Sequence, residues 1–288
     1  MTLDGASTPR ELLDGAVRIL AAAAVAEPRL DAELLLAHAS GRTRAAILSG
    51  GLEVDGALRA RFAALIARRA RREPLAYLTG EREFYSLALE VTPAVLIPRP
   101  ETELVVERAL VWLARRAPGR VLDLGTGSGA IAIAIAAHAE AAVVATDVSA
   151  EALTVARRNV VRHGLQERIA LRRADVFTAL DGGPPLERFD LIVSNPPYIS
   201  ERELPRLQPE IRCYEPRQAL AGGDDGLKFY RLLAAGLRDH SSAGGCVIVE
   251  IGAGQAAAAA ELFQEEGWRA IESARDLSGI IRVLVVTR

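Results

Sequence analysis

The spacing of apolar residues divides the sequence into parts of different character. From Ser7 to about Arg72, apolar residues recur three or four positions apart, which is typical of amphipathic helices, and strand patterns are almost absent. This region predicts helices that begin near Ser7-Thr8-Pro9-Arg10-Glu11 and continue over Pro28–His38, Thr43–Leu48 and Ala57–Arg72. In the second helix we expect Leu30, Leu34 and Leu35 to face inward. Residues 1–73 should therefore form a small N-terminal helical bundle.

Residues 74–100 have a different pattern. Leu75, Tyr77 and Leu78, and then residues 84–91, alternate well enough to predict a β-hairpin that links two domains. Two prolines then bracket Arg99 within residues 96–103, which should hold that loop taut before a helix over Glu101–Arg116.

From Arg120 onward, short apolar runs alternate with helical patterns. Strands are predicted over 120–124, 142–146, 169–173, 189–193 and 245–251, and helices over 129–138, 149–163, 226–238 and 255–266. This alternation predicts a mostly parallel sheet with helices on both faces, a Rossmann-like α/β fold over residues 101–288. Two last runs, 270–274 and 280–287, are separated by only five residues and predict an antiparallel hairpin that closes the sheet edge, with an antiparallel final strand.

Composition narrows the class of protein. The 288 residues carry a net charge of −2, which gives no general attraction to nucleic acid or to acidic lipid. Two cysteines, Cys213 and Cys246, show neither metal-ligand spacing nor a disulfide framework, and the four histidines are scattered. With no signal peptide or membrane-length apolar run, we expect a cytoplasmic protein without a metal and without a membrane partner.

One basic cluster stands out from this average. The helix predicted to end at Arg72 contains Arg59, Arg61, Arg68, Arg69, Arg71 and Arg72. The cluster is either a solvated helix face or a surface that docks an anionic macromolecule.

A glycine-rich turn follows the strand that begins at Arg120. The loop consists of Gly125, Thr126, Gly127, Ser128 and Gly129. Its glycines let the backbone approach a ligand at the carboxyl edge of the sheet. Asp147 ends the next strand, 20 residues after Gly127 (147 − 127 = 20), an offset at which a carboxylate meets ribose hydroxyls.

Two further carboxylates bear on the choice of cofactor. Asp123, two residues before the first glycine, would repel the pyrophosphate of NAD but attract the ammonium and sulfonium of S-adenosylmethionine. Charge therefore favours S-adenosylmethionine and disfavours a dehydrogenase. Asp175 follows the third strand, where it could accept from the adenine amino group or serve only as a cap.

Asn195-Pro196-Pro197-Tyr198 follows the fourth strand. The consecutive prolines stiffen the loop and remove two backbone donors. The carbonyl oxygens of Asn195 and Pro196 and the Asn195 side-chain oxygen could then accept from one planar NH2 group, with Tyr198 as an aromatic wall. Such a site suits a carboxamide or the edge of a base. The alternative is a Pro-Pro turn that merely ends a strand.

Together these motifs resemble a family. The glycine loop, Asp147, Asp175 and Asn195-Pro196-Pro197-Tyr198 are similar to those of class I methyltransferases that act on a planar nitrogen. Residues 96–103, the helical N-terminal part, Tyr214-Glu215-Pro216 and residues 219–223 resemble the release-factor glutamine methyltransferases, the HemK or PrmC family. The resemblance spans nearly the whole chain and is strongest over residues 77–252.

The resemblance implies a reaction and its partners. It implies transfer of a methyl group from S-adenosylmethionine to N5 of the glutamine in the Gly-Gly-Gln motif of class I peptide-chain release factors, which the helical domain docks. It implies that the loop with Arg99 and Glu103 covers the cofactor. The family pattern has an aromatic residue at the position of Val176, so stacking on adenine should be weaker here or supplied by Phe177.

Other interpretations compete with this one. The same acceptor site could hold an adenine or guanine amino group of DNA or RNA after base flipping, although the net charge disfavours nucleic acid. A non-catalytic module that binds the ribosome or a translation factor is disfavoured by the intact motifs. Glu250, which ends a strand, fits a structural partner better than a catalyst, and a monomer is the default expectation.

Overall fold

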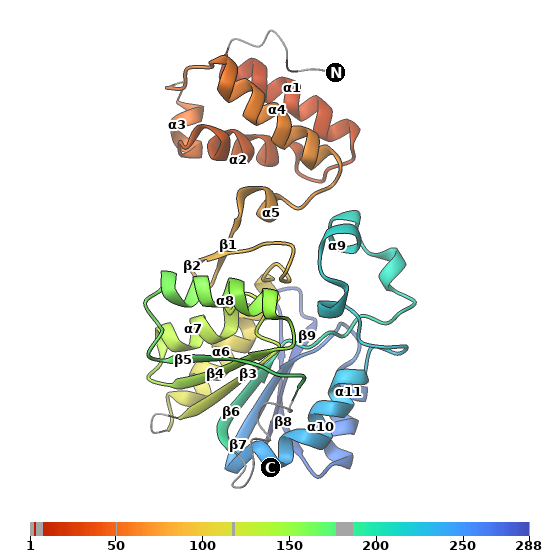
Figure 1. Ribbon diagram of the computed structural model, residues 1–288. Helices are drawn as coiled ribbons and strands as arrows, with labels where there is room; N and C mark the ends of the chain where they lie inside the picture. The colour runs from red at the N-terminus through yellow and green to blue at the C-terminus, as the bar shows by residue number, and fades with distance from the viewer. Residues whose placement is uncertain (1–2, 4–7, 50, 117–118, 177–186, 288) are drawn as a thin grey trace. The chain divides into compact units, whose positions relative to one another are not determined.

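The computed structural model describes residues 3, 8–49, 51–116, 119–176 and 187–287 (Figure 1). The chain divides into two compact units. The helical unit comprises Met1–Gly80 with Gln208–Tyr214, and the sheet unit comprises Glu81–Leu207 with Glu215–Arg288. Among the described residues, no helix has the length and apolar character needed to cross a membrane.

The helical unit contains the predicted helices. They are α1 (Pro9–Ala22), α2 (Pro28–Ser40), α3 (Arg44–Leu48) and α4 (Gly56–Ala70), followed by α5 (Leu75–Thr79) and α9 (Pro209–Tyr214). Thr8 and Glu11 form a capping box at the start of α1, because each side chain accepts the other residue's backbone N–H at 3.2 and 3.1 Å. Gly41 ends α2 in the left-handed conformation.

Two details of this unit differ from the prediction. On α2, Ala32, Leu35 and Leu36 are buried, whereas Leu30 is 39% exposed. The inward stripe is thus offset from the predicted one. Leu75–Thr79 forms a helix where alternation suggested a strand, since Leu75 and Leu78 are also spaced for one helix face.

Three of the six clustered arginines, Arg68, Arg69 and Arg72, form ion pairs within the helical unit. The Arg69 side chain is only 7% exposed and contacts Asp31 at 2.7 Å and Glu210 at 3.0 Å. Arg72 also binds Glu210, at 2.7 Å, and Arg68 pairs with Glu73. For Arg69 a solvated helix face is therefore wrong. Its partners lie 38 and 141 residues away along the chain, beyond the reach of helix periodicity.

The sheet unit confirms the predicted fold class. In the described residues its larger sheet has the order β5-β4-β3-β6-β7-β9-β8. The strands are β3 (Arg120–Leu124), β4 (Ala142–Asp147), β5 (Ile169–Arg173), β6 (Phe189–Ser194), β7 (Ser241–Glu250), β8 (Arg269–Arg275) and β9 (Ile281–Thr287). The strands from β5 to β7 pair in parallel, whereas β9 is antiparallel to both β7 and β8. The final strand thus lies between β7 and β8, and β8 forms the edge.

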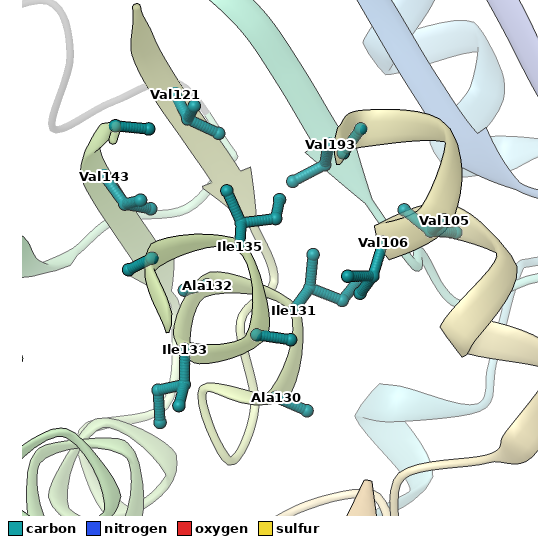
Figure 2. Close-up of a cluster of buried hydrophobic side chains, with 14 of the residues drawn as sticks. Val105, Val106, Val121, Ala130, Ile131, Ala132, Ile133, Ile135, Val143 and Val193 are labelled. Atoms are coloured by element: carbon teal, nitrogen blue, oxygen red, sulfur yellow. The ribbon is translucent and has the colours of Figure 1, made fainter. Parts of the chain in front are cut away.

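Helices cover both faces of this sheet. They are α6 (Glu103–Leu113), α7 (Ala130–His138), α8 (Ala150–Arg162), α10 (Lys228–His240) and α11 (Ala256–Glu265), with short 3-10 turns at Pro100–Thr102, Leu204–Arg206 and Arg217–Ala219. Figure 2 shows Val121, Val143 and Val193 of three neighbouring strands facing Ile131 and Ile135 of α7. The neighbouring strand residues Leu122, Val144 and Ile192 point to the opposite face. There they belong to one core cluster with Tyr230 of α10 and Phe263 of α11. This two-sided burial holds the carboxyl ends of the parallel strands in place.

A hairpin is present within residues 74–100, but its first arm is not the predicted run at 75–78, and its turn falls inside the predicted second run, 84–91. It pairs β1 (Glu81–Phe84) with β2 (Leu87–Glu90) in antiparallel register. Its turn residues Tyr85 and Ser86 have φ angles of +50° and +60°, the twist that suits a two-residue hairpin turn.

Candidate active site

A cavity of about 220 Å³ lies at the carboxyl ends of β3, β4 and β6. Open parallel sheets bind ligands at this edge. Its wall includes residues from the glycine loop, from the ends of β4, β5 and β6, and from the loop before α6: Gly125, Gly127, Asp147, Asp175, Asn195 and Leu96. The cavity lies entirely within the sheet unit.

The glycine loop leaves its backbone open to this cavity. Gly125 and Gly127 have φ angles of +73° and +56°, and a Cβ added at either would meet nothing within 4 Å. A ligand therefore has room to approach the backbone at both positions. Gly129 has a different role, because a Cβ there would lie 3.0 Å from Ile133 and 3.5 Å from Ala156. It allows α7 and α8 to pack closely.

Asp147 holds this loop as well as lining the cavity. Its Oδ2 accepts the Gly127 N–H at 2.9 Å and its Oδ1 accepts the Ser149 N–H at 2.9 Å. Burial raises the pKa of this carboxyl group. Each carboxylate oxygen can accept more than one bond, so the side chain can also receive a ligand hydroxyl.

Asp175 and Val176 both line the cavity, and Asp175 is exposed. Val176 has a φ angle of +51°, which is strained for a β-branched residue. Phe177, the suggested alternative for stacking on adenine, lies outside the described residues.

Asp123 is not among the residues that line the cavity, and its contact with the cofactor stays a prediction. It is fully buried, and its Oδ2 accepts the Thr126 hydroxyl at 2.6 Å. Burial raises the pKa of Asp123 to about 7. The carboxyl group lies beneath the glycine loop, where Thr126 and Ser128 themselves line the cavity.

Arg99 and Glu103 are not among the residues that line the cavity, although their loop contributes to its wall, and their part in covering the cofactor stays a prediction. Arg99 pairs with the buried carboxylate of Glu215, whose other oxygen accepts the Ile97 N–H at 3.2 Å. Glu103 accepts the N–H of Tyr85 in the hairpin turn at 2.9 Å. These side chains shape a loop whose other members, including Leu96 and Pro98, form the wall.

Asn195, Pro196 and Pro197 line the cavity as the sequence suggested. The Asn195 Nδ2 donates to Thr102 Oγ1 at 3.1 Å, and the Thr102 hydroxyl donates to Glu250 Oε2 at 2.6 Å. Tyr198 is not part of the wall; its hydroxyl donates to Glu250 Oε1 at 3.1 Å. Burial raises the pKa of Glu250 to about 7 and that of Tyr198 above its usual range.

Sequence reasoning missed several residues that build this site. Thr102, Gln218 and Phe229 line the cavity, and only Thr102 falls in a motif singled out beforehand. Asn159 is fully buried on α8. It accepts the Glu90 N–H at 2.7 Å and donates to the carbonyls of Glu90 and Ser128 at 2.9 Å. The sequence offered one signal for Asn159, because asparagine is a poor helix former and this one lies inside a predicted helix.

Comparison with known proteins agrees with this geometry. Residues 11–80 match the PrmC N-terminal domain and residues 103–209 the Methyltransferase small domain. Proteins named release factor glutamine methyltransferase are similar over almost the whole length. That of Geobacter sulfurreducens is 44% identical over 96% of this chain and 95% of its own, and that of Agrobacterium fabrum is 39% identical over all of both. The chain belongs to the release factor glutamine methyltransferases.

Solved structures show the same fold. A methyltransferase from Pyrococcus furiosus has a TM-score of 0.55 at 21% identity and covers 76% of this chain and 97% of its own. The catalytic domain of hMettl16, solved with a 3′UTR hairpin, has a TM-score of 0.54 at 16% identity and covers 77% of this chain and 79% of its own. The fold alone therefore does not select a protein or a nucleic-acid substrate.

Proposed function

We propose that this protein transfers a methyl group from S-adenosylmethionine to N5 of the glutamine in the Gly-Gly-Gln motif of class I peptide-chain release factors, and so supports translation termination. One observation carries the proposal beyond family membership. Asn195 and Pro196 lie in the wall of the same cavity as the glycine loop and Asp147. A planar amide and a cofactor can therefore meet there.

The residues present fit S-adenosylmethionine. Gly125 and Gly127 leave open backbone for the methionine portion, and Asp147 offers carboxylate oxygens to the ribose hydroxyls. Asp175 and Val176 line the same cavity, and in this proposal Asp175 accepts from the adenine amino group while Val176 is an apolar neighbour of the base. When bound, this cofactor supplies a methyl group on a sulfonium, which the substrate nitrogen takes while sulfur keeps the electron pair of the broken bond.

Asn195 and Pro196 orient the glutamine amide. An amide nitrogen is a poor nucleophile because its lone pair is delocalised into the carbonyl. The Asn195 side-chain oxygen and the Pro196 carbonyl accept its two N–H bonds, turn the lone pair toward the cofactor and favour positive charge developing on nitrogen. No strong general base is required, because the proton can leave the nitrogen after the transfer.

The remaining parts have supporting roles in this proposal. The helical unit docks the release factor. Tyr198, which is not part of the cavity wall, stays a predicted neighbour of the substrate. We further propose that the protein acts as a monomer in the cytoplasm. The runner-up function, methylation of an adenine or guanine amino group, uses the same two acceptors.

Methyl-labelled S-adenosylmethionine separates these functions. The protein is incubated with a class I release factor, with the same factor carrying alanine for the Gly-Gly-Gln glutamine, and with RNA and DNA. We expect label on the first factor and none on the second. Label in nucleic acid alone would favour the alternative. Asn195→Ala should reduce turnover to a small but measurable rate while cofactor affinity changes by less than about twofold. An equal loss of both would contradict the assigned role.

A further inference from the structure

One buried carboxylate joins both ends of the Asn195-Pro196-Pro197-Tyr198 loop. Glu250, 1% exposed at the end of β7, accepts from the Thr102 hydroxyl through Oε2 and from the Tyr198 hydroxyl through Oε1. Thr102, 4% exposed in the turn before α6, accepts in turn from Asn195 Nδ2. Three segments distant in sequence thus share one hydrogen-bonded chain.

The direction of these bonds follows from the chemistry of Glu250. Above its pKa of about 7, Glu250 is an ionised carboxylate that only accepts, so the single hydroxyl proton of Thr102 is committed to it. Thr102 Oγ1 then offers only lone pairs to Asn195, and these can pair only with the NH2 end of the carboxamide. The reversed amide would set Asn195 Oδ1 against Thr102 Oγ1, two acceptors without a proton between them.

We infer that Thr102 and Glu250 are positioning residues that fix the direction of the Asn195 carboxamide. With Nδ2 held by Thr102, Oδ1 is the end that meets the substrate amide. A reversed carboxamide would present N–H groups to the N–H groups of the substrate and could not hold it. Of Asn195, Thr102 and Glu250, only Asn195 touches the substrate, and the other two residues act through it. The kinetic part of this inference rests on the proposed function.

Substitutions at Thr102 provide the kinetic test. Thr102→Val removes the hydroxyl at nearly constant shape, and Thr102→Ser keeps it. We expect Thr102→Val to lower kcat about tenfold or more, with little change in KM or in cofactor affinity, and Thr102→Ser to recover most of the loss. Thr154→Val, the same change at an exposed site on α8, is the matched control and should leave kcat unchanged.

A double-mutant cycle shows whether Thr102 acts through Asn195. In an Asn195→Ala background, Thr102→Val should cause no further loss of turnover, because the carboxamide that it orients is gone. A further tenfold or so loss in that background would overturn the inference.

A second readout needs no substrate. The chain has only two asparagines, Asn159 and Asn195, so labelling with side-chain ¹⁵N-asparagine gives two NH2 signals. We expect Thr102→Val to shift the Asn195 pair and to speed its hydrogen exchange, whereas the Asn159 pair stays fixed as an internal reference. Glu250→Gln should also shift the Asn195 pair, since an amide cannot accept through both of its ends.

The activity assay and the NMR measurement distinguish failure of the proposed function from failure of the positioning role. If the wild-type protein does not methylate a release factor but the Asn195 signals respond as described, the proposed function fails and the positioning role stands. Asn195 signals that are unchanged in Thr102→Val would overturn the inference, whatever the activity.

Discussion

The backbone N–H of Gly127 donates a 2.9 Å hydrogen bond to Oδ2 of Asp147. The second strand of the cofactor site thereby fixes the loop that follows the first strand. Two motifs that the sequence presents separately form one structural unit, because β3 and β4 are neighbours in parallel register.

Asp147→Asn should weaken binding of S-adenosylmethionine about tenfold or more. The asparagine side chain keeps one oxygen, and its NH2 group cannot accept an N–H, so one of the two hydrogen bonds from Gly127 and Ser149 is lost. The ribose also loses a charged acceptor. Isothermal titration measures the dissociation constant. Glu151→Gln, an exposed acid at the start of α8, is the control and should leave it within about twofold. Equal affinity in both variants would contradict the role of Asp147.

Asn159→Ala should lower the free energy of unfolding by about 3 kcal/mol, since it breaks three hydrogen bonds and leaves buried backbone groups unpaired. Arg158→Ala is a close control, because Arg158 also binds Glu90 but through a side chain that is 49% exposed. Its cost should stay below about 1 kcal/mol. Urea unfolding of the two variants gives the comparison, and similar losses would refute the structural importance of Asn159.

Arg69→Ala should destabilise the helical unit by about 3 kcal/mol. It leaves the Asp31 carboxylate, only 9% exposed, without its arginine partner, and it leaves Glu210, 15% exposed, paired with Arg72 alone. Arg10→Ala removes an arginine whose side chain is 90% exposed and serves as the control. Its effect should be below about 1 kcal/mol. Unfolding followed by circular dichroism tests the pair. A small loss for Arg69→Ala would contradict a stabilising role for its ion pairs.

Asp123→Asn should change how stability depends on pH. The folded-state pKa of about 7 lies above the unfolded value of 3.8, so the native protein binds this proton more tightly than the unfolded chain does. The contribution of the Asp123 carboxyl group to the free energy of unfolding of the wild type is therefore fully present below about pH 4, and it is lost as the pH rises to about 7.

The variant cannot lose that contribution, so its stability relative to wild type should rise by a few kcal/mol across this window, at about 1.4 kcal/mol for each unit of pKa shift. Urea unfolding of both proteins at several pH values measures the difference, in which other titrating groups cancel. A difference that does not vary with pH would show that Asp123 is ionised throughout.

The order of helices and strands could be predicted from the sequence because it depends on local properties. Thr8 and Glu11 can cap only a helix that starts between them, Gly41 ends α2 because it adopts the left-handed conformation, and the alternation of Val121 and Leu122 suits a strand buried on both faces. The glycine loop and the Asn-Pro-Pro-Tyr loop could be located in the same way, since each follows a buried strand.

The partners of individual side chains required the folded chain. Thr102 meets Glu250 across 148 residues of sequence, and Arg69 meets Glu210 across 141. The last strand, β9, lies between β7 and β8. Asp123 turned out to lie beneath the glycine loop although it sits two residues from it. Periodicity and propensity depend on the residues that are near in sequence. Contacts between distant residues depend instead on which segments lie side by side, and this is set by the strand order of the sheet and by the burial of both of its faces.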